Sequence, residues 1–126
     1  MSWIAKTISN FSRREVDALF KQASLAYRDP GITVLCAPDA YSFGRVLPII
    51  SRKVGTAPVR NKIKRQLRAI FYLEKLYAQG IDCAVIVRPE AATYTFEMLK
   101  TICITALQRY AKRTQKSASS AQDARS

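Results

Sequence analysis

Apolar residues recur at two different spacings along the chain, and each spacing predicts one kind of element. Ser12 and Glu15 form the S-x-x-E pattern of a capping box, in which each side chain accepts a backbone N–H of the other residue at a helix start. Apolar residues then follow three or four positions apart as far as Ala23, so they share one face. This pattern predicts a first helix from Ser12 to about Ala23, followed by a turn at residues 29–31.

Short apolar runs bounded by turn residues predict the strands. Residues 32–37 and 43–53 are two such runs. Pro48 lies in the second run and cannot donate a backbone hydrogen bond, so we expect that strand at a sheet edge or at a bulge. Residues 81–89 are apolar at nearly every position, which is typical of a strand covered on both faces.

Two longer amphipathic segments predict the remaining helices. The first has Thr56 as its N-cap and runs to about Tyr77, before Gly80. The second begins near Thr95, and its apolar residues recur at helical spacing as one stripe. That stripe consists of Phe96, Leu99, Cys103, Leu107 and Tyr110.

The order of these elements predicts the domain organisation. Helix, strands, helix, strand and helix together predict a single α/β domain over residues 1–112, in which helices cover a sheet. Residues 113–126 are polar and of low complexity, which predicts a disordered basic and polar tail.

Net charge narrows the class of partner. The chain has 21 Lys and Arg against 9 Asp and Glu, a net charge of +12, which favours a polyanion such as nucleic acid or an anionic membrane. Membrane binding would need an apolar helix face free for lipid, and the domain needs those faces for its core. No apolar run approaches the roughly 20 residues of a spanning helix, and the start of the chain lacks the apolar core of a signal peptide. We therefore expect a soluble cytoplasmic protein with no membrane partner.

Residue types also limit the chemistry. The chain has no histidine, so imidazole acid–base catalysis is excluded. Cys36, Cys83 and Cys103 lie far apart in apolar runs, which favours buried, reduced thiols. The carboxylates show no paired metal-ligand spacing, so we expect no catalytic residue, and a protein-bound metal ion is neither indicated nor excluded.

Positive charge is concentrated between Ser51 and Phe71, where no acidic residue occurs. At about 100° per residue, four cations and one amide of the second predicted helix share an arc of about 140°, opposite the apolar residues. Like charges stand four positions apart twice, and each such pair destabilises an isolated helix by about 0.2–0.5 kcal/mol. A solvated face would carry mixed signs, so this pattern favours phosphate binding. We call Arg60, Asn61, Lys64, Arg65 and Arg68 the basic face; Arg52 and Lys53 precede it closely.

The same residues carry a resemblance to a known family. The segment VRNKIKRQLR, residues 59–68, resembles the R-N-x-x-K-R-x-x-R (RNR) signature of the protein component of bacterial ribonuclease P, and the basic face matches every specified position. Residues 12–20, 51–55 and 82–92 are similar to the family's first helix, its basic strand end and its last strand and loop.

That resemblance implies a fold: a small two-layer α/β sandwich with a central, mostly antiparallel sheet of about four strands, three helices and a left-handed β-α-β crossover. It also implies a function. The family is a subunit of an endoribonuclease that removes the 5′ leader of precursor tRNA, and the RNA subunit carries out catalysis with bound Mg²⁺. One protein would bind each catalytic RNA. A general RNA-binding or ribosome-associated module is the alternative, but a generic basic patch needs no fixed N-x-x-K-R spacing.

Site residues follow from the resemblance. It implies that Arg52, Lys53 and the basic face bind the catalytic RNA. It implies that the leader lies in a cleft lined by Val16, Phe20 and Cys36. Val16 and Cys36 stand where the family commonly has aromatic residues. Because stacking is worth about 1–3 kcal/mol per base, we expect this cleft to rely more on shape and charge.

Overall fold

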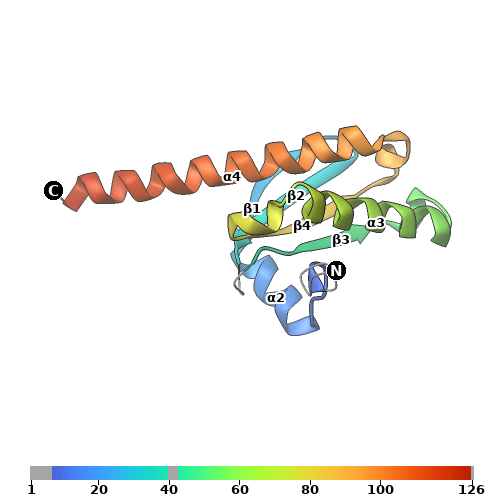
Figure 1. Ribbon diagram of the computed structural model, residues 1–126, viewed down its shortest axis with the longest axis horizontal. Helices are drawn as coiled ribbons and strands as arrows, with labels where there is room; N and C mark the ends of the chain where they lie inside the picture. Colours follow the sequence, from blue (N-terminus) through green and yellow to red (C-terminus); the bar gives the residue numbers. More distant parts are fainter. Residues whose placement is uncertain (1–6, 40–42, 126) are drawn as a thin grey trace.

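A computed structural model gives the architecture, and it describes residues 7–39 and 43–125 (Figure 1). Helices and strands follow one another along the chain in the order given next. The elements are α2 (Arg13–Gln22), β1 (Ser24–Arg28), β2 (Ile32–Pro38), β3 (Val46–Ile50), the 3-10 turn η1 (Arg52–Val54), α3 (Ala57–Leu73), η2 (Leu76–Gln79), β4 (Ile81–Val87), η3 (Pro89–Thr93) and α4 (Phe96–Arg125).

The four strands form one mixed sheet in the order β1-β2-β4-β3. β1 pairs with β2 and β2 pairs with β4 in antiparallel fashion, whereas β3 and β4 are parallel. The expected α/β class and the mostly antiparallel sheet are therefore confirmed, with one parallel pair joined through α3. The left-handedness of that β-α-β crossover stays a prediction. β3 is an outer strand, which confirms the edge position expected from Pro48.

The two faces of the sheet are covered unequally. α3 and α4 lie on one face, and α2 lies on the other (Figure 1). Alternation along β2 sends Val34 and Cys36 into the larger core under α3 and α4, and Leu35 and Ala37 toward α2. Among the residues that the structure describes, the cluster beneath α2 has only three buried members, Leu19, Ala37 and Ala84. We call this side of the sheet the α2 face; α2 covers only part of it.

Strand β1 was not expected from the sequence. The chain leaves the helical conformation at Ala23, which has φ −70° and ψ 142°, and continues as a strand paired with β2. Apolar residues at 23, 26 and 27 keep helical spacing, so periodicity could not mark this change. A β-bulge lies between Leu25 and Tyr27. Leu25 consequently pairs with Leu35 on the α2 face, while Tyr27 pairs with Val34 on the opposite side.

Two helix ends differ from expectation. α3 ends at Leu73 rather than near Tyr77, because Lys75 adopts a left-handed conformation with φ 53° and a 3-10 turn follows. α4 continues to Arg125, where the sequence predicted a disordered tail from residue 113. The segment 113–126 contains neither glycine nor proline and is rich in residues that tolerate helix, so polar composition alone did not exclude a helical backbone.

Asp29 organises the turn between β1 and β2. Its Oδ1 accepts hydrogen bonds from the backbone N–H of Gly31 and Ile32, both at 2.7 Å, and from the Tyr94 hydroxyl at 2.9 Å. Its Oδ2 accepts from the Tyr27 hydroxyl at 2.8 Å. A Cβ at Gly31 would lie 2.8 Å from the backbone nitrogen of Ala91, so only glycine fits this close approach. The carboxylate thus joins the hairpin to the segment before α4.

Asp29 should make stability depend on pH. Burial raises the pKa of this carboxyl, but hydrogen bonds from Tyr27, Ile32, Tyr94 and Gly31 outweigh burial and lower the pKa overall. A lowered folded-state pKa means that the stabilisation is present above the unfolded value of about 3.9 and is lost as pH falls through the folded value. Asp29→Asn should lower the free energy of unfolding at pH 7 by about 1–3 kcal/mol.

Urea unfolding at pH 7 and at pH values below 4 measures this effect. Asp29→Asn should also weaken the acid dependence of stability, whereas Asp17→Asn, at an exposed position on α2, serves as the matched control. Equal acid dependence in the Asp29 variant and the unmodified chain would contradict the assignment.

Candidate nucleic-acid interface

The basic face is held outward by the apolar side of α3. Ile63, Leu67, Ile70 and Phe71 are buried in the larger core, which fixes the rotation of the helix about its axis. On the other side, Asn61, Arg65 and Arg68 are exposed, and Arg60 and Lys64 are partly exposed. The structure therefore brings all five residues of the basic face to one solvent-facing side.

No acidic side chain neutralises this face in the described part of the chain. The ion pairs found there involve Arg45 and Lys100, not the basic face. Arg68 donates only to the carbonyl of Lys64, at 3.4 Å, and the buried Nε of Arg60 has no hydrogen-bond partner among the described residues. Uncompensated cations on a rigid helix are suited to bind phosphate groups.

Arg52 and Lys53 lie at the start of the same helix. They form η1 after β3, where Ser51 Oγ accepts from the backbone N–H of Lys53 at 3.2 Å and Val54 is buried. Both cationic side chains are exposed. Thr56 is the N-cap of α3, as expected, but its side chain makes no capping hydrogen bond. The first N–H groups of α3 thus add partial positive charge beside two cations.

A hollow separates the basic face from the edge strand β3. It has a volume of about 400 Å³ and is lined by Asn61, Lys64 and Arg68 from α3 and by Leu47 and Pro48 from β3. Val59, an apolar residue in the first turn of α3, is 41% exposed. The apolar stripe of α3 therefore begins one turn later, at Ile63.

Helix α2 carries two of the three residues expected in the cleft. Both hydrogen bonds of the capping box are present, from Ser12 N–H to Glu15 Oε1 at 3.0 Å and from Glu15 N–H to Ser12 Oγ at 3.2 Å. Leu19 is buried against the α2 face, which leaves Phe20 40% exposed and Val16 half-buried. These two side chains stand four positions apart and therefore lie on the same side of α2.

Cys36 does not join them. It is fully buried on the opposite side of the sheet, and its Sγ lies 3.3 Å from Cys83 Sγ. Because successive strand residues alternate between faces, its neighbour Leu35 points toward α2 instead. The placement of Cys36 in the cleft is thus not supported. All three cysteines are buried free thiols, and burial raises the pKa of Cys103 to about 12.

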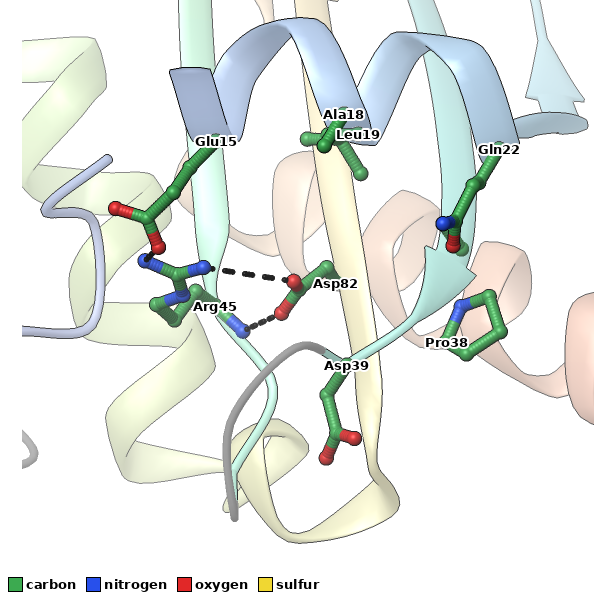
Figure 2. A pocket seen from close by; sticks show the side chains of 9 residues that line it. Glu15, Ala18, Leu19, Gln22, Pro38, Asp39, Arg45 and Asp82 are labelled. Carbon is green, nitrogen blue, oxygen red and sulfur yellow. Dashed lines mark hydrogen bonds and ion pairs between the residues drawn. The ribbon is translucent and has the colours of Figure 1, made fainter. Parts of the chain in front are cut away.

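The role of Arg45 was not expected from the sequence. Its side chain is 1% exposed and forms ion pairs with Glu15 of α2 at 2.8 Å and with Asp82 of β4 at 3.8 Å (Figure 2). It also donates to the Asn10 carbonyl at 2.8 Å, and its guanidinium lies 4.1 Å from the ring centroid of Phe11. Arg45 lies in an apolar run, and no spacing of residues around it in the sequence indicates a buried ion pair.

The described residues contain neither a metal-ligand cluster nor a membrane-spanning helix. Within residues 7–39 and 43–125, no cluster of three His, Cys, Asp or Glu residues has the arrangement of a metal site. None of the described helices is long and apolar enough to span a bilayer.

Comparison with known proteins agrees with this geometry. The family model described as Ribonuclease P matches residues 11–111, which includes the basic face, α2 and the whole sheet. The chain belongs to the ribonuclease P protein family. Three related chains named "Ribonuclease P protein component" show how far the sequence similarity extends.

The protein of Thermus scotoductus is 43% identical over 65 residues, which are 52% of this chain and 39% of that protein. The protein of Bacillus cereus (strain B4264) is 41% identical over 61 residues, which are 48% of this chain and 53% of that protein. The protein of Brevibacillus brevis is 26% identical over 96 residues, which are 75% of this chain and 76% of that protein. The first two alignments thus span about half or less of those relatives.

Solved structures share the fold. The RNase P protein of Thermotoga maritima superposes with a TM-score of 0.66 at 26% identity, covering 80% of this chain and 96% of that one. The RNase P protein of Staphylococcus aureus superposes with a TM-score of 0.68 at 22% identity, covering 80% and 93%. The architecture of this ribonuclease P family member is therefore that of known RNase P proteins.

Loss of the Arg45 guanidinium should destabilise the fold strongly. Arg45→Met would leave the buried carboxylate of Asp82 without its cation, and breaking a buried pair in this way costs about 3–5 kcal/mol. Urea unfolding at neutral pH measures the loss. Arg45→Lys keeps the charge and should recover part of it, whereas equal stability of both variants would show that charge compensation is unimportant here.

Proposed function

We propose that this chain is the protein subunit of ribonuclease P and that it binds the catalytic RNA through the basic face, Arg52 and Lys53. The observation that carries the proposal is the RNR signature on an exposed helix side that no described acid neutralises. Phosphates of RNA would supply the missing negative charge. These contacts would be to the sugar-phosphate backbone of the RNA, so they would position the RNA and would not read its sequence.

The uncovered part of the α2 face would receive the 5′ leader of precursor tRNA. Leu35, Leu47 and Ile49 are only partly buried there, and α2, which packs on this face through Leu19, carries Val16 and Phe20. Apolar and aromatic side chains of this kind can contact unstacked bases.

Cations border one end of this face. Arg28 pairs with Thr33, whose side chain points to the α2 face, and Arg88 donates to Thr33 Oγ1 at 2.8 Å. Arg52 and Lys53 follow β3 at the same end of the sheet, where Ser51 N–H donates to the Val87 carbonyl at 3.0 Å. An RNA strand that crosses this face would therefore find apolar partners for its bases and cationic partners for its phosphates.

Catalysis would belong to the RNA subunit with its Mg²⁺ ions. The carboxylates of Glu15 and Asp82 are engaged by Arg45, and the described residues hold no metal-ligand cluster. The protein's contribution would be to bind and orient both RNAs, with one protein per catalytic RNA in the cytoplasm. Neutralising phosphates near the cleavage site would also lower the concentration of Mg²⁺ that the RNA needs.

Cleavage of precursor tRNA by the cognate catalytic RNA at low Mg²⁺, with and without this protein, tests the proposal. We expect cleavage at a Mg²⁺ concentration at which the RNA alone is inactive. RNA binding without any lowering of the Mg²⁺ requirement would instead indicate a general RNA-binding module.

Phe20→Ala should weaken the binding of precursor tRNA more than that of mature tRNA. A lost stacking contact costs about 1–3 kcal/mol per base, and only the precursor has a leader. Because Phe20 is 40% exposed, its truncation should destabilise the fold by less than the 3–5 kcal/mol or so typical of a buried phenylalanine. Affinities of the reconstituted complex for both tRNAs, with thermal melts as control, measure this. An equal loss for both tRNAs would exclude a leader contact.

Arg65→Ala and Arg68→Ala should each weaken binding to the catalytic RNA and flatten its salt dependence. Each lost phosphate contact reduces the slope of log affinity against log salt by about 0.7–0.9. Asn61→Ala should lower the affinity with little change of slope, because it carries no charge. Salt titrations of binding measure the slopes, and circular dichroism melts control for folding. Unchanged slopes in both arginine variants would show that this face is only a solvated surface.

A further inference from the structure

A second hollow lies at the opposite edge of the sheet, between β1 and α4. It is open, has a volume of about 350 Å³, and is lined by Tyr27, Tyr94, Met98 and Ile102 with Asp29 and Glu97. Met98 is 44% exposed although it is apolar. Both tyrosine hydroxyls donate to the Asp29 carboxylate, at 2.8 and 2.9 Å, and these bonds fix the orientation of the two rings. The hollow is therefore a preformed aromatic and apolar surface.

Cations continue this surface along α4. Arg109, Lys112 and Arg113 are exposed, and at about 100° per residue they share an arc of about 100°. The Arg109 guanidinium lies 5.5 Å from the ring centroid of Tyr27, so it directly adjoins the hollow. Arg113 donates to the Leu25 carbonyl at 2.8 Å, which holds α4 against β1. No acidic residue occurs from position 98 to position 122. Three clustered like charges favour an anionic partner, as on the basic face.

This surface is distinct from the basic face and from the α2 face. β1 and β3 are the two outer strands, and three strand spacings of about 4.8 Å separate them by about 14 Å. The basic face borders β3, whereas the hollow borders β1. Tyr27 also points to the opposite side of the sheet from Leu25 and Leu35. A strand bound on the α2 face would not fill the hollow.

We infer that this edge is a further binding site for single-stranded RNA, with an unpaired base against Tyr27, Tyr94 and Met98 and the adjoining phosphates against Arg109 and Lys112. The carboxylates of Asp29 and Glu97 line the hollow, so a phosphate is disfavoured inside it and an uncharged base is favoured. A duplex is disfavoured because its bases are already stacked and paired. The inference rests on the proposed function only in taking RNA as the ligand.

Two sources could supply such a strand: the leader beyond the α2 face, or an unpaired segment of the catalytic RNA. The chemistry of recognition is the same for both.

Arg109→Gln/Lys112→Gln removes two charges from the edge and leaves Arg113 to hold β1. The matched control is Arg14→Gln/Lys75→Gln, which removes two exposed charges elsewhere. Met98→Glu places a carboxylate in the hollow.

Binding would be measured by salt titration with four RNAs: a labelled ten-nucleotide oligouridine, a hairpin duplex, the catalytic RNA, and precursor tRNAs with short and long leaders in the reconstituted complex. The edge double variant should lose about five- to tenfold in affinity for oligouridine. Its slope of log affinity against log salt should fall by about 1.4, which is two single-strand contacts at 0.7 each. Met98→Glu should lower the same affinity, and the control should change it less than twofold.

The RNA that is affected identifies the source. A loss confined to long-leader precursors assigns the strand to the leader, and a loss for the catalytic RNA assigns it to that subunit; either result supports the site. Equal effects of the edge and control variants on every RNA would overturn it, as would equal losses for oligouridine and duplex or a neutral Met98→Glu. Failure of the proposed function is separate, because it would appear as no stimulation of cleavage by the unmodified chain.

Discussion

The arrangement of the α2 face depends on the ion pairs that the buried guanidinium of Arg45 forms. The guanidinium joins the start of α2, through Glu15 and the nearby Asn10 carbonyl, to the central strand β4, through Asp82. Glu15 also completes the capping box, so one carboxylate both starts the helix and attaches it to the sheet. Because α2 buries only Leu19 fully, apolar contact alone would hold it weakly. The ion pairs therefore fix the spacing between α2 and the sheet.

The two sides of helix α3 have different roles. Its apolar residues pack against the sheet together with α4. This packing turns the basic face toward solvent. The repulsion among its cations is tolerated because burial of residues such as Leu67 and Phe71, at about 1.5–3 kcal/mol each, far exceeds the few tenths of a kcal/mol lost per like-charge pair. Stability and binding are thus carried by opposite sides of one helix.

Sequence reasoning succeeded where one local rule determined the outcome. The capping box at Ser12, the amphipathic pattern of α3 and the edge position of Pro48 each follow from a short segment, and all three are present. It failed where the outcome depended on pairing between distant segments. The face to which Cys36 points is set by register with β4, and the ion pairs of Arg45 join residues 30 and 37 positions away in the chain, at Glu15 and Asp82. The existence of β1 likewise depends on its pairing with β2, since its own residues fit a helix equally well.

The bulge in β1 has a consequence for how the molecule can evolve. A regular strand shows alternate residues to one side, so Leu25 and Tyr27 would face the same way. The additional residue, Ala26, reverses this parity partway along the strand. One outermost strand therefore contributes Leu25 and Arg28 to the surface beside α2, and Tyr27 to the surface beside α4. Substitutions at neighbouring positions of this strand can alter one surface without altering the other. Removal of Ala26 would make Leu25 and Tyr27 neighbours in a regular strand and would leave each side chain on its present side.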